Sequence, residues 1–142
     1  MKDFFIRLFM DINAFIIRVT NGRIGGKLGT QSILLLETVG RKSGQTRVIP
    51  IAYFFYEGKY LIVESNWGKE KHANWYWNLR KHPRATLTVN GKKIPVDAHE
   101  AEGEEYTRLW KFATERHPPY LDYQKMTSRK IPVMVFQPLG GQ

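Results

Sequence analysis

Two tight turns constrain the fold of this chain more than any other feature of its sequence. Asn90-Gly91 lies inside "RATLTVNGKKIPVDAHEA", between two runs of strand-forming residues, and Glu57-Gly58 lies in the same way inside "RVIPIAYFFYEGKYLIVESN". An Asn-Gly pair tolerates the positive φ angles of a two-residue turn, so it is the strongest short-range signal for a β-hairpin. Hairpins therefore dominate the pattern, no βαβ unit is evident, and the sheet is predicted to be mainly antiparallel.

The remaining elements fit around these hairpins. Strands are predicted at "SILLLETV" and at "IPVMVFQPL" near the end of the chain. Helices are predicted at "KEKHANWYWNLRKHP", which Pro83 ends, and at "EGEEYTRLWKFATERH", whose acidic first turn and basic last turn suit the helix dipole. The segment "PPYLDYQKMTSRK" is predicted to be irregular. This order indicates an α+β fold with about six strands, a small barrel being one form of it, and the length of 142 residues suits one domain.

The first 20 residues, "MKDFFIRLFMDINAFIIRVT", predict an amphipathic helix. Four charged residues fall on one stripe at helical spacing: Asp3, Arg7, Asp11 and Arg18. These charges interrupt the run of about 20 apolar residues that a membrane span needs, and no small-residue cleavage site of a signal peptide follows. Two interpretations stay open, a helix packed on the domain or on a partner subunit and a helix lying on a membrane surface. Residues 21–30 contain four glycines and are predicted to be a linker, with residues 31–138 as the barrel core.

Charge and composition limit the chemistry. The formal net charge of +9 and the pI near 9.9 favour anionic partners, such as phosphorylated small molecules, nucleic acid or an acidic membrane surface. The absence of cysteine excludes disulfides, thiolate ligands and cysteine nucleophiles, and it fits a cytoplasmic location, with membrane association as the alternative. The four histidines lack metal-ligand spacing, and there is no Gly-x-Ser-x-Gly elbow. The sequence therefore predicts no metal centre and no nucleophilic triad.

The stretch "VGRKSGQTRVIP" is the first candidate site. Its glycines allow a turn in which backbone N–H groups point into one concavity, and such a concavity binds anions. Arg41 and Lys42 add charge, Arg47 can grip a phosphate with two donors, and Ser43 adds a hydroxyl. The spacing is not that of a P-loop. From the loop alone, a cradle for an anion and an ordinary basic turn both remain open.

Two further segments carry candidate residues. In "ESNWGKEKHANWYWN" a strand runs through a polar turn into a helix, whose N-terminal amides and lysines favour anions. Trp75 and Trp77 point to different faces of that helix, so one is expected in the core and the other at a pocket wall. In "HPPYLDYQK", Tyr120 and Tyr123 would share a face in a helical turn and offer a flat ring with a hydroxyl donor to a planar ligand. Core packing and loop anchoring are the alternatives for these aromatic residues.

Together, the order and spacing of "LLLETVGRKSGQTRVIPI", "ESNWGKEKHANWYWNLRKHP" and "PPYLDYQKMTSRKIPV" resemble the deazaflavin-dependent nitroreductase family of split β-barrel oxidoreductases. The likeness runs over residues 33–138. It implies a split β-barrel and an F420-dependent reductase that transfers hydride to an activated alkene, a quinone or a nitro compound. F420 is an 8-hydroxy-5-deazaflavin with a phosphate and an oligoglutamate tail, and the cofactor itself supplies the hydride chemistry.

The resemblance also implies roles for individual residues. The loop with Arg41, Lys42 and Ser43, and beyond it Arg47, would hold the phosphate and the acidic tail. The other implied cofactor contacts are Ile49, Pro50 and Ile51 along the ring, Ser65 and Asn66 at its polar edge, and Lys71, Ala73, Asn74 and Trp75 at the helix start. Ser65, Tyr120 and Tyr123 are the implied catalytic residues. The chain departs from the family pattern at Asn66, where lysine is common, at Ala73, where proline is common, and at His117, where some members carry another aromatic residue.

Rival functions stay open at this point. The same fold binds FMN in related oxidoreductases, and a basic phosphate loop would serve both cofactors. A nucleic-acid-binding module explains the charge but needs cations spread along a stripe, whereas the cations singled out here cluster at two loops. A peripheral membrane protein would combine the basic charge with residues 1–20. The expected partner is a small-molecule electron acceptor rather than nucleic acid, and the oligomeric state is left open, with a dimer as one outcome.

Overall fold

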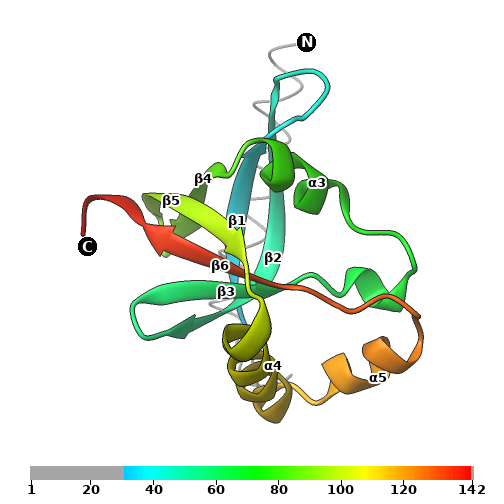
Figure 1. The fold of residues 1–142 in the computed structure, drawn as a ribbon. Coiled ribbons are helices and arrows are strands. Elements are labelled where there is room, and N and C mark those ends of the chain that lie inside the picture. The colour runs from blue at the N-terminus through cyan, green and yellow to red at the C-terminus, as the bar shows by residue number, and fades with distance from the viewer. Residues whose placement is uncertain (1–30, 142) are drawn as a thin grey trace.

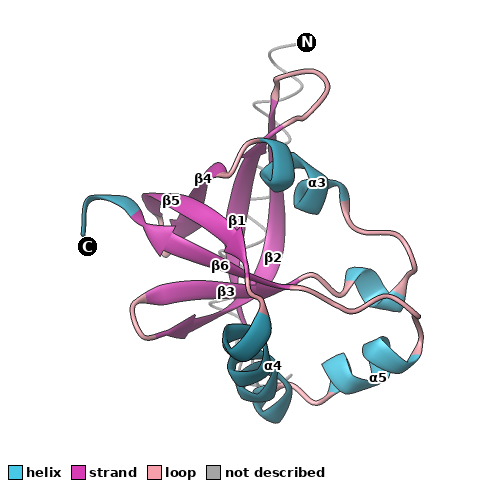
Figure 2. Ribbon diagram, viewed as in Figure 1, coloured by secondary structure: helices cyan, strands magenta, loops and turns pink. Residues whose placement is uncertain are grey.

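The computed structural model describes residues 31–141 as a six-stranded barrel with three α-helices outside it (Figure 1). The strands are β1 Ser32–Val39, β2 Thr46–Tyr56, β3 Lys59–Val63, β4 Arg84–Val89, β5 Lys92–Glu100 and β6 Val133–Pro138. The helices are α3 Asn74–Lys81, α4 Gly103–Arg116 and α5 Pro119–Lys125, with short 3-10 turns η1 Asn66–Gly68 and η2 Leu139–Gly141. Figure 2 shows that α4 and α5 lie together at one end of the barrel, whereas α3 lies apart from them.

All neighbouring strands are antiparallel. The barrel closes in the order β1-β2-β3-β6-β5-β4. The predicted hairpin turns lie between β2 and β3 and between β4 and β5, with positive φ angles at Glu57, Gly58, Asn90 and Gly91. The predicted α+β fold with about six mainly antiparallel strands is confirmed.

Strand β2 has one open edge within the described residues. Residues 46–53 of this strand pair with β1 on one side and have no β3 partner on the other. Only residues 54–56 pair with β3. Backbone groups on the unpaired side of residues 46–53 are thus left outside the sheet's hydrogen-bond ladder.

The hydrophobic core has two parts, and the wall of the barrel separates them. The interior part includes Leu34, Leu36, Ile62, Leu87 and Phe136, and Trp75 and Leu79 of α3 pack against it. The second part joins β3 and β6 to α4 and α5, and its members include Leu61, Val135, Leu109, Ala113 and Tyr120. Strands β3 and β6 are consequently buried on both faces, which explains why their sequences are apolar without alternation.

Two predicted elements differ from the structure. The segment predicted to be irregular contains α5, because Pro119 lies in the first turn, where a missing N–H has no consequence for the helix. The helix predicted from Lys69 begins only at Asn74. Residues before Asn74 are held in a turn by side-chain to backbone bonds, such as Asn66 Nδ2 to the Lys71 carbonyl at 2.7 Å.

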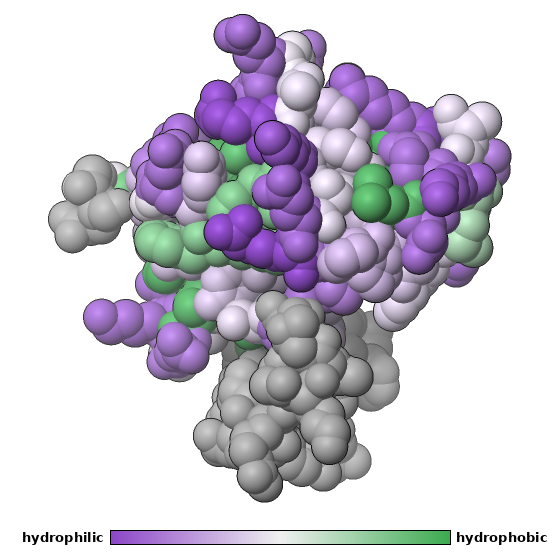
Figure 3. Space-filling model, turned by 90° about the horizontal axis from the view of Figure 1, so that it is seen from below, coloured by the Kyte–Doolittle hydropathy of each residue, from purple (hydrophilic) through white to green (hydrophobic). Residues whose placement is uncertain are grey.

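The predictions for residues 1–20 and 21–30 lie outside the described residues, and the division of the chain stays a prediction. Between residues 31 and 141, no helix has both the length and the hydropathy to cross a bilayer. The face shown in Figure 3 is mostly hydrophilic, with separate small apolar areas. Exposed large apolar side chains over the described range are Phe55, Trp67, Trp77, Leu121 and Met126.

Candidate functional site

A cavity of about 480 Å³ lies where the β1–β2 loop meets α3. Its size is within the range of about 300–1,000 Å³ that is usual for small-molecule sites. The lining residues are Thr38, Gly40, Arg41, Lys42, Ser43, Arg47, Ile49, Asn74, Trp75 and Asn78. Most of these were predicted as cofactor contacts, although residues 38–49 and 74–78 belong to separate segments.

The loop between β1 and β2 is a tight turn that needs its glycines. The Gly40 N–H donates to the Gln45 carbonyl at 2.7 Å, and a Cβ on Gly40 would lie 2.9 Å from Ser43 Oγ. Gly44 has a φ of 74° and donates to the Gly40 carbonyl at 2.9 Å. The Gln45 N–H bonds Ser43 Oγ at 3.1 Å. The amides of Gly40, Gly44 and Gln45 therefore bond within the loop, and these three donors are not available to an anion.

Arg41 is held against α3 by a buried asparagine that the sequence analysis missed. Asn78, with 4% of its surface exposed, accepts from the Arg41 backbone N–H at 3.1 Å and from Arg41 Nη1 at 3.0 Å. Its own amide donates to Thr38 Oγ1 at 3.2 Å. Lys81 Nζ also donates to the Arg41 carbonyl. Asn78 follows Trp75 by three positions, so it is a polar residue on the buried face of α3, and that pattern could have revealed it.

Lys42 and Arg47 are the exposed cations of the cavity. Arg47 Nη2 lies 3.4 Å from Ser43 Oγ, so the serine hydroxyl is next to the guanidinium. Among the lining residues that the structure describes, none is Asp or Glu. The cavity thus attracts anions, and its positive charge is not neutralised by a carboxylate in its wall.

The predicted strand contacts continue from the cavity along the open edge of β2. Ile49 lines the cavity, and Pro50 and Ile51 follow it. Ile49 and Ile51 pack on the interior core, whereas Pro50 is exposed. Trp75 combines the two roles expected for the tryptophans, because it belongs to the core and also lines the cavity, while Trp77 is exposed.

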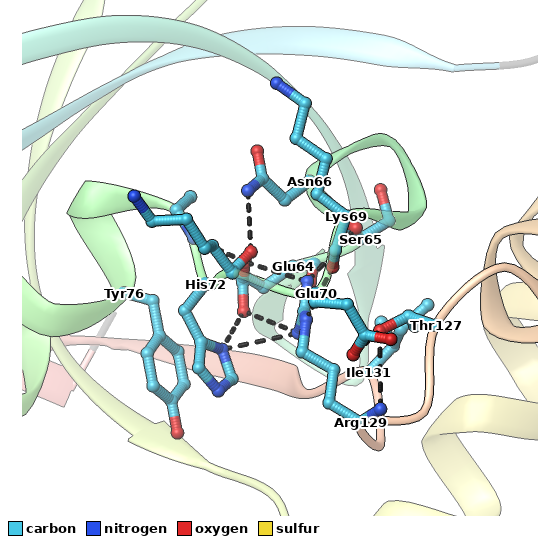
Figure 4. A network of polar contacts seen from close by, with 12 residues as sticks. Glu64, Ser65, Asn66, Lys69, Glu70, His72, Tyr76, Thr127, Arg129 and Ile131 are labelled. Carbon is cyan, nitrogen blue, oxygen red and sulfur yellow. Dashed lines mark hydrogen bonds and ion pairs between the residues drawn. The ribbon is translucent and has the colours of Figure 1, made fainter.

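A second group of predicted residues lies in the segment between β3 and α3 and does not line the cavity. Ser65 and Asn66 are half-buried, and Lys71 is exposed. The Ala73 N–H donates to Glu64 Oε2 at 2.8 Å, which ties the start of α3 back to the end of β3. Figure 4 shows the polar contacts that converge on Glu64 from this segment.

The two tyrosines of α5 have different surroundings. Tyr120 is 6% exposed, and its hydroxyl accepts from Gln31 Nε2 at 2.7 Å. Tyr123 is half-buried, and its ring meets the ring of Trp67 edge-on at 6.2 Å. Trp67 itself is 71% exposed. Tyr123 is therefore the tyrosine with access to a ligand from the η1 side.

Burial changes the acid–base properties of two neighbouring rings at α5. Removal from water raises the pKa of Tyr120, partly offset by the bond from Gln31, so this hydroxyl keeps its proton near neutral pH. Burial also lowers the pKa of His117, whose ring lies 4.9 Å from that of Tyr120. Over residues 31–141, no group of three or more His, Cys, Asp or Glu side chains could hold a metal ion.

Comparison with known proteins shows which family the chain belongs to. The model of the family described as F420H(2)-dependent quinone reductase matches residues 9–138. The chain belongs to this family. It is an F420-dependent reductase with F420 as its cofactor, and the resemblance seen in its three motifs is confirmed.

Relatives and solved structures of F420-dependent reductases agree with this assignment. The chain is 39% identical over 127 residues to F420H(2)-dependent quinone reductase Rv1261c of Mycobacterium tuberculosis (strain ATCC 25618 / H37Rv), covering 84% of this chain and 83% of that protein. A solved F420-H2 dependent reductase (FDR-A) superposes with a TM-score of 0.68 at 40% identity, over 74% of this chain and 93% of that one. A second structure, described as a domain-swapped dimer, has a TM-score of 0.69 at 34% identity, over 88% of this chain and 99% of the other.

Proposed function

We propose that this protein transfers hydride from reduced F420 to a quinone. The observation that carries the proposal is the grouping of Arg41, Lys42 and Arg47 around one cavity, which Ile49 of the unpaired stretch of β2 also lines. The anionic tail of the cofactor needs a cluster of cations, and its flat ring needs an accessible strand next to that cluster. This chain has the cations and the strand in one place.

The residues of the cavity fit the polar end of F420. Lys42 and Arg47 are exposed cations in a wall without a carboxylate among the described lining residues, so they would bind the phosphate and acidic tail. Arg41 would add charge from a fixed position, because Asn78 already holds its guanidinium. Ser43 would donate its hydroxyl beside Arg47.

The residues beyond the cavity would hold the ring. Ile49, Pro50 and Ile51 would lie along one side of it, and Ser65 and Asn66 would make its polar contacts. Lys71, Ala73, Asn74 and Trp75 would border it at the start of α3. When bound in its reduced form, F420 supplies a hydride from a ring carbon.

The chain's own part in the reaction is to orient the acceptor and stabilise charge on it. The Tyr123 hydroxyl would donate to an acceptor oxygen as negative charge develops there, and Ser65 would act as a second donor. Tyr120 would support Tyr123, because its buried ring lies 6.4 Å from the ring of Tyr123. Exposed Trp67 beside Tyr123 would exclude water from one side of the acceptor.

Quinone is the preferred acceptor because the curated relatives are quinone reductases by name. Activated alkenes and nitro compounds also gather negative charge on oxygen during reduction, so the same hydroxyl donors would serve them. A competition assay with menadione, cyclohexenone and a nitroaromatic compound at equal concentration ranks the three classes. Faster turnover of the enone or of the nitro compound than of menadione contradicts the quinone assignment.

The cofactor proposal is tested by titration of the purified protein with F420 and with FMN, followed by fluorescence. Cations suited to an acidic tail predict micromolar or tighter binding of F420 and weaker binding of FMN. Equal affinity for the two cofactors, or FMN that co-purifies at full occupancy, contradicts the proposed site.

We also propose a partner for the segment that precedes the barrel. Residues 1–20 have a wide apolar face in sequence, which suits either a second copy of the chain or a membrane surface at the cytoplasmic side. The similar domain-swapped dimer favours the second copy. Removal of residues 1–20 should leave a folded barrel and change its sedimentation or its binding to anionic liposomes. A truncated protein that keeps both properties rules out this role for the segment.

A further inference from the structure

Arg129 lies between α5 and β6, and its side chain is 11% exposed (Figure 4). Its guanidinium makes an unusual set of bonds to the end of β3 and the turn after it. Nε donates to the Lys69 carbonyl at 2.9 Å, and Nη2 donates to the carbonyls of Ser65 at 3.2 Å and Glu64 at 3.3 Å. One side chain thus bonds three backbone carbonyls of a segment about 60 positions away in sequence.

The segment that Arg129 holds has strained backbone geometry. Asn66, Trp67 and Gly68 follow one another with φ angles of 46°, 59° and 79°. Residues other than glycine adopt this left-handed region rarely, and a run of them persists only where the surroundings fix it. Arg129 bonds the carbonyls of Ser65 and Lys69, which lie directly before and after this run, so it fixes the positions of both ends.

Glu64 explains why an arginine can be buried at this point. The side chain of Glu64 is 0% exposed and lies 3.2 Å from Arg129 Nη1. Its carboxylate also meets His72 Nδ1 at 2.6 Å and accepts from the Ala73 N–H. Arg129 and Glu64 therefore join the turn after β3, the start of α3 and the segment before β6 into one unit.

A second set of contacts fixes the same two segments together. The Glu70 carboxylate accepts from Thr127 Oγ1 at 2.8 Å and from the Ser128 N–H at 3.1 Å. Gly68 is buried so closely that an added Cβ would lie 3.0 Å from Met126 Cβ. The turn therefore cannot shift without a shift of the segment that carries Arg129.

We propose that Arg129 is a positioning residue: it fixes the strained Ser65–Gly68 turn and thereby presents Ser65 and Asn66 to the cofactor ring. The proposal rests on the proposed function, in which Ser65 and Asn66 contact F420. Lysine carries the same charge but only one nitrogen, so it can neutralise Glu64 yet cannot bond three carbonyls in a fixed plane.

The test compares Arg129→Lys with the wild-type protein and with Arg80→Lys as a matched control. Arg80 lies on α3, outside the turn, and bonds the side chains of Tyr76 and Glu100. In the cofactor-free protein, hydrogen exchange of residues 65–71 should become at least tenfold faster in Arg129→Lys and stay unchanged in Arg80→Lys. F420 affinity, followed by fluorescence, should fall about tenfold in Arg129→Lys alone.

A double-mutant cycle with Ser65→Ala separates positioning from a general loss of stability. If Arg129 acts through the turn, Ser65→Ala weakens F420 binding in the wild-type background and has little further effect in Arg129→Lys. Full additivity of the two changes, or wild-type exchange of residues 65–71 in Arg129→Lys, overturns the proposal.

Two other experimental results also have a defined meaning. If Arg129→Lys does not fold, the double variant Glu64→Gln/Arg129→Gln replaces it, because this variant leaves no unpaired buried charge. Hydrogen exchange of residues 65–71 is then measured in the double variant and judged in the same way. If the wild-type protein fails to bind F420, the proposed function fails, whereas the exchange measurement still decides whether Arg129 fixes the turn.

Discussion

Arg41 and Lys42 are neighbours in sequence, but their charges are used differently. The guanidinium of Arg41 is bonded to Asn78 and to the Asn74 carbonyl, so much of its bonding capacity is used within the protein. Lys42 is exposed at the mouth of the same cavity. A ligand anion would therefore gain more from Lys42 than from its better-ordered neighbour.

Replacement of Lys42 by alanine should weaken F420 binding by about 1–2 kcal/mol, the scale of a charge-assisted bond that is partly screened by water. The loss should shrink as salt is raised, because ions already screen the intact contact. Fluorescence titration at low and high salt measures both effects. Lys111→Ala on α4 removes the same charge away from the cavity and should leave the affinity unchanged. Equal losses in the two variants would point to net charge instead of a specific contact.

The two tyrosines of α5 make a similar contrast. Tyr123→Phe should lower quinone turnover by about 2–4 kcal/mol at the transition state, since one donor to the developing charge is lost. F420 affinity should stay within a few-fold. Tyr120→Phe should reduce turnover less, because the side chain of Tyr120 is buried and less accessible to an acceptor. Steady-state kinetics with several quinones measures both variants, and full turnover by Tyr123→Phe would remove its hydroxyl from the mechanism.

At the scale of elements, η1 and α5 pack too closely to allow a side chain between them. Gly68 has a φ of 79°, and an added Cβ would lie 3.1 Å from Met126 Sδ and 3.2 Å from the Tyr123 carbonyl. Glycine is needed here for two separate reasons, its conformation and its size.

A matched pair of substitutions separates these reasons. Gly58 in the β2–β3 hairpin has the same φ of 79° but has nothing within 4 Å of an added Cβ. Gly58→Ala should cost about 1–2 kcal/mol of unfolding free energy for the conformation alone. Gly68→Ala should cost about 1–3 kcal/mol more, because it also overpacks the contact with α5. Urea denaturation of the two variants measures the difference in unfolding free energy. Equal losses of unfolding free energy would show that α5 moves to accept the added methyl group without an energetic cost.

Most elements could be predicted from local patterns, and those that could not depend on distant contacts. The hairpins were predictable because Asn90 and Gly91 determine the turn with their own backbone preferences. The late start of α3 was not, because the preceding turn is held by Arg129, which is 65 positions from Glu64. The seven-residue helix α5 was missed because it is too short to show a helical period.

The same division applies to the site. The resemblance pointed to most of the residues that line the cavity, since they lie in motifs. It did not indicate Asn78, whose spacing from Trp75 indicates a buried polar residue but does not reveal that its partner is Arg41, 37 positions away. A residue that only positions a functional residue can be recognised from the structure but not from the sequence, because the pattern of a single sequence does not show which residues are in contact.

At the scale of the whole molecule, the open edge of β2 affects solubility as well as binding. An unpaired strand edge is a template for the strand of another molecule, and residues 46–53 are rich in β-branched and aromatic side chains that favour such pairing. Pro50 lies in the middle of this edge and cannot donate a backbone bond to an incoming strand. We therefore expect Pro50 to oppose self-association of the cofactor-free barrel.

Substitution of Pro50 by valine should thus accelerate aggregation of the cofactor-free protein, as followed by light scattering during mild heating. Pro50→Lys restores the same N–H but adds a charge, so it should stay dispersed. Saturating F420 should reduce aggregation of the valine variant, because the ligand would cover the unpaired edge of β2. If β2 receives the flat ring as proposed, the same open edge in the cofactor-free protein is a place where a second chain could add, and Pro50 would oppose that addition.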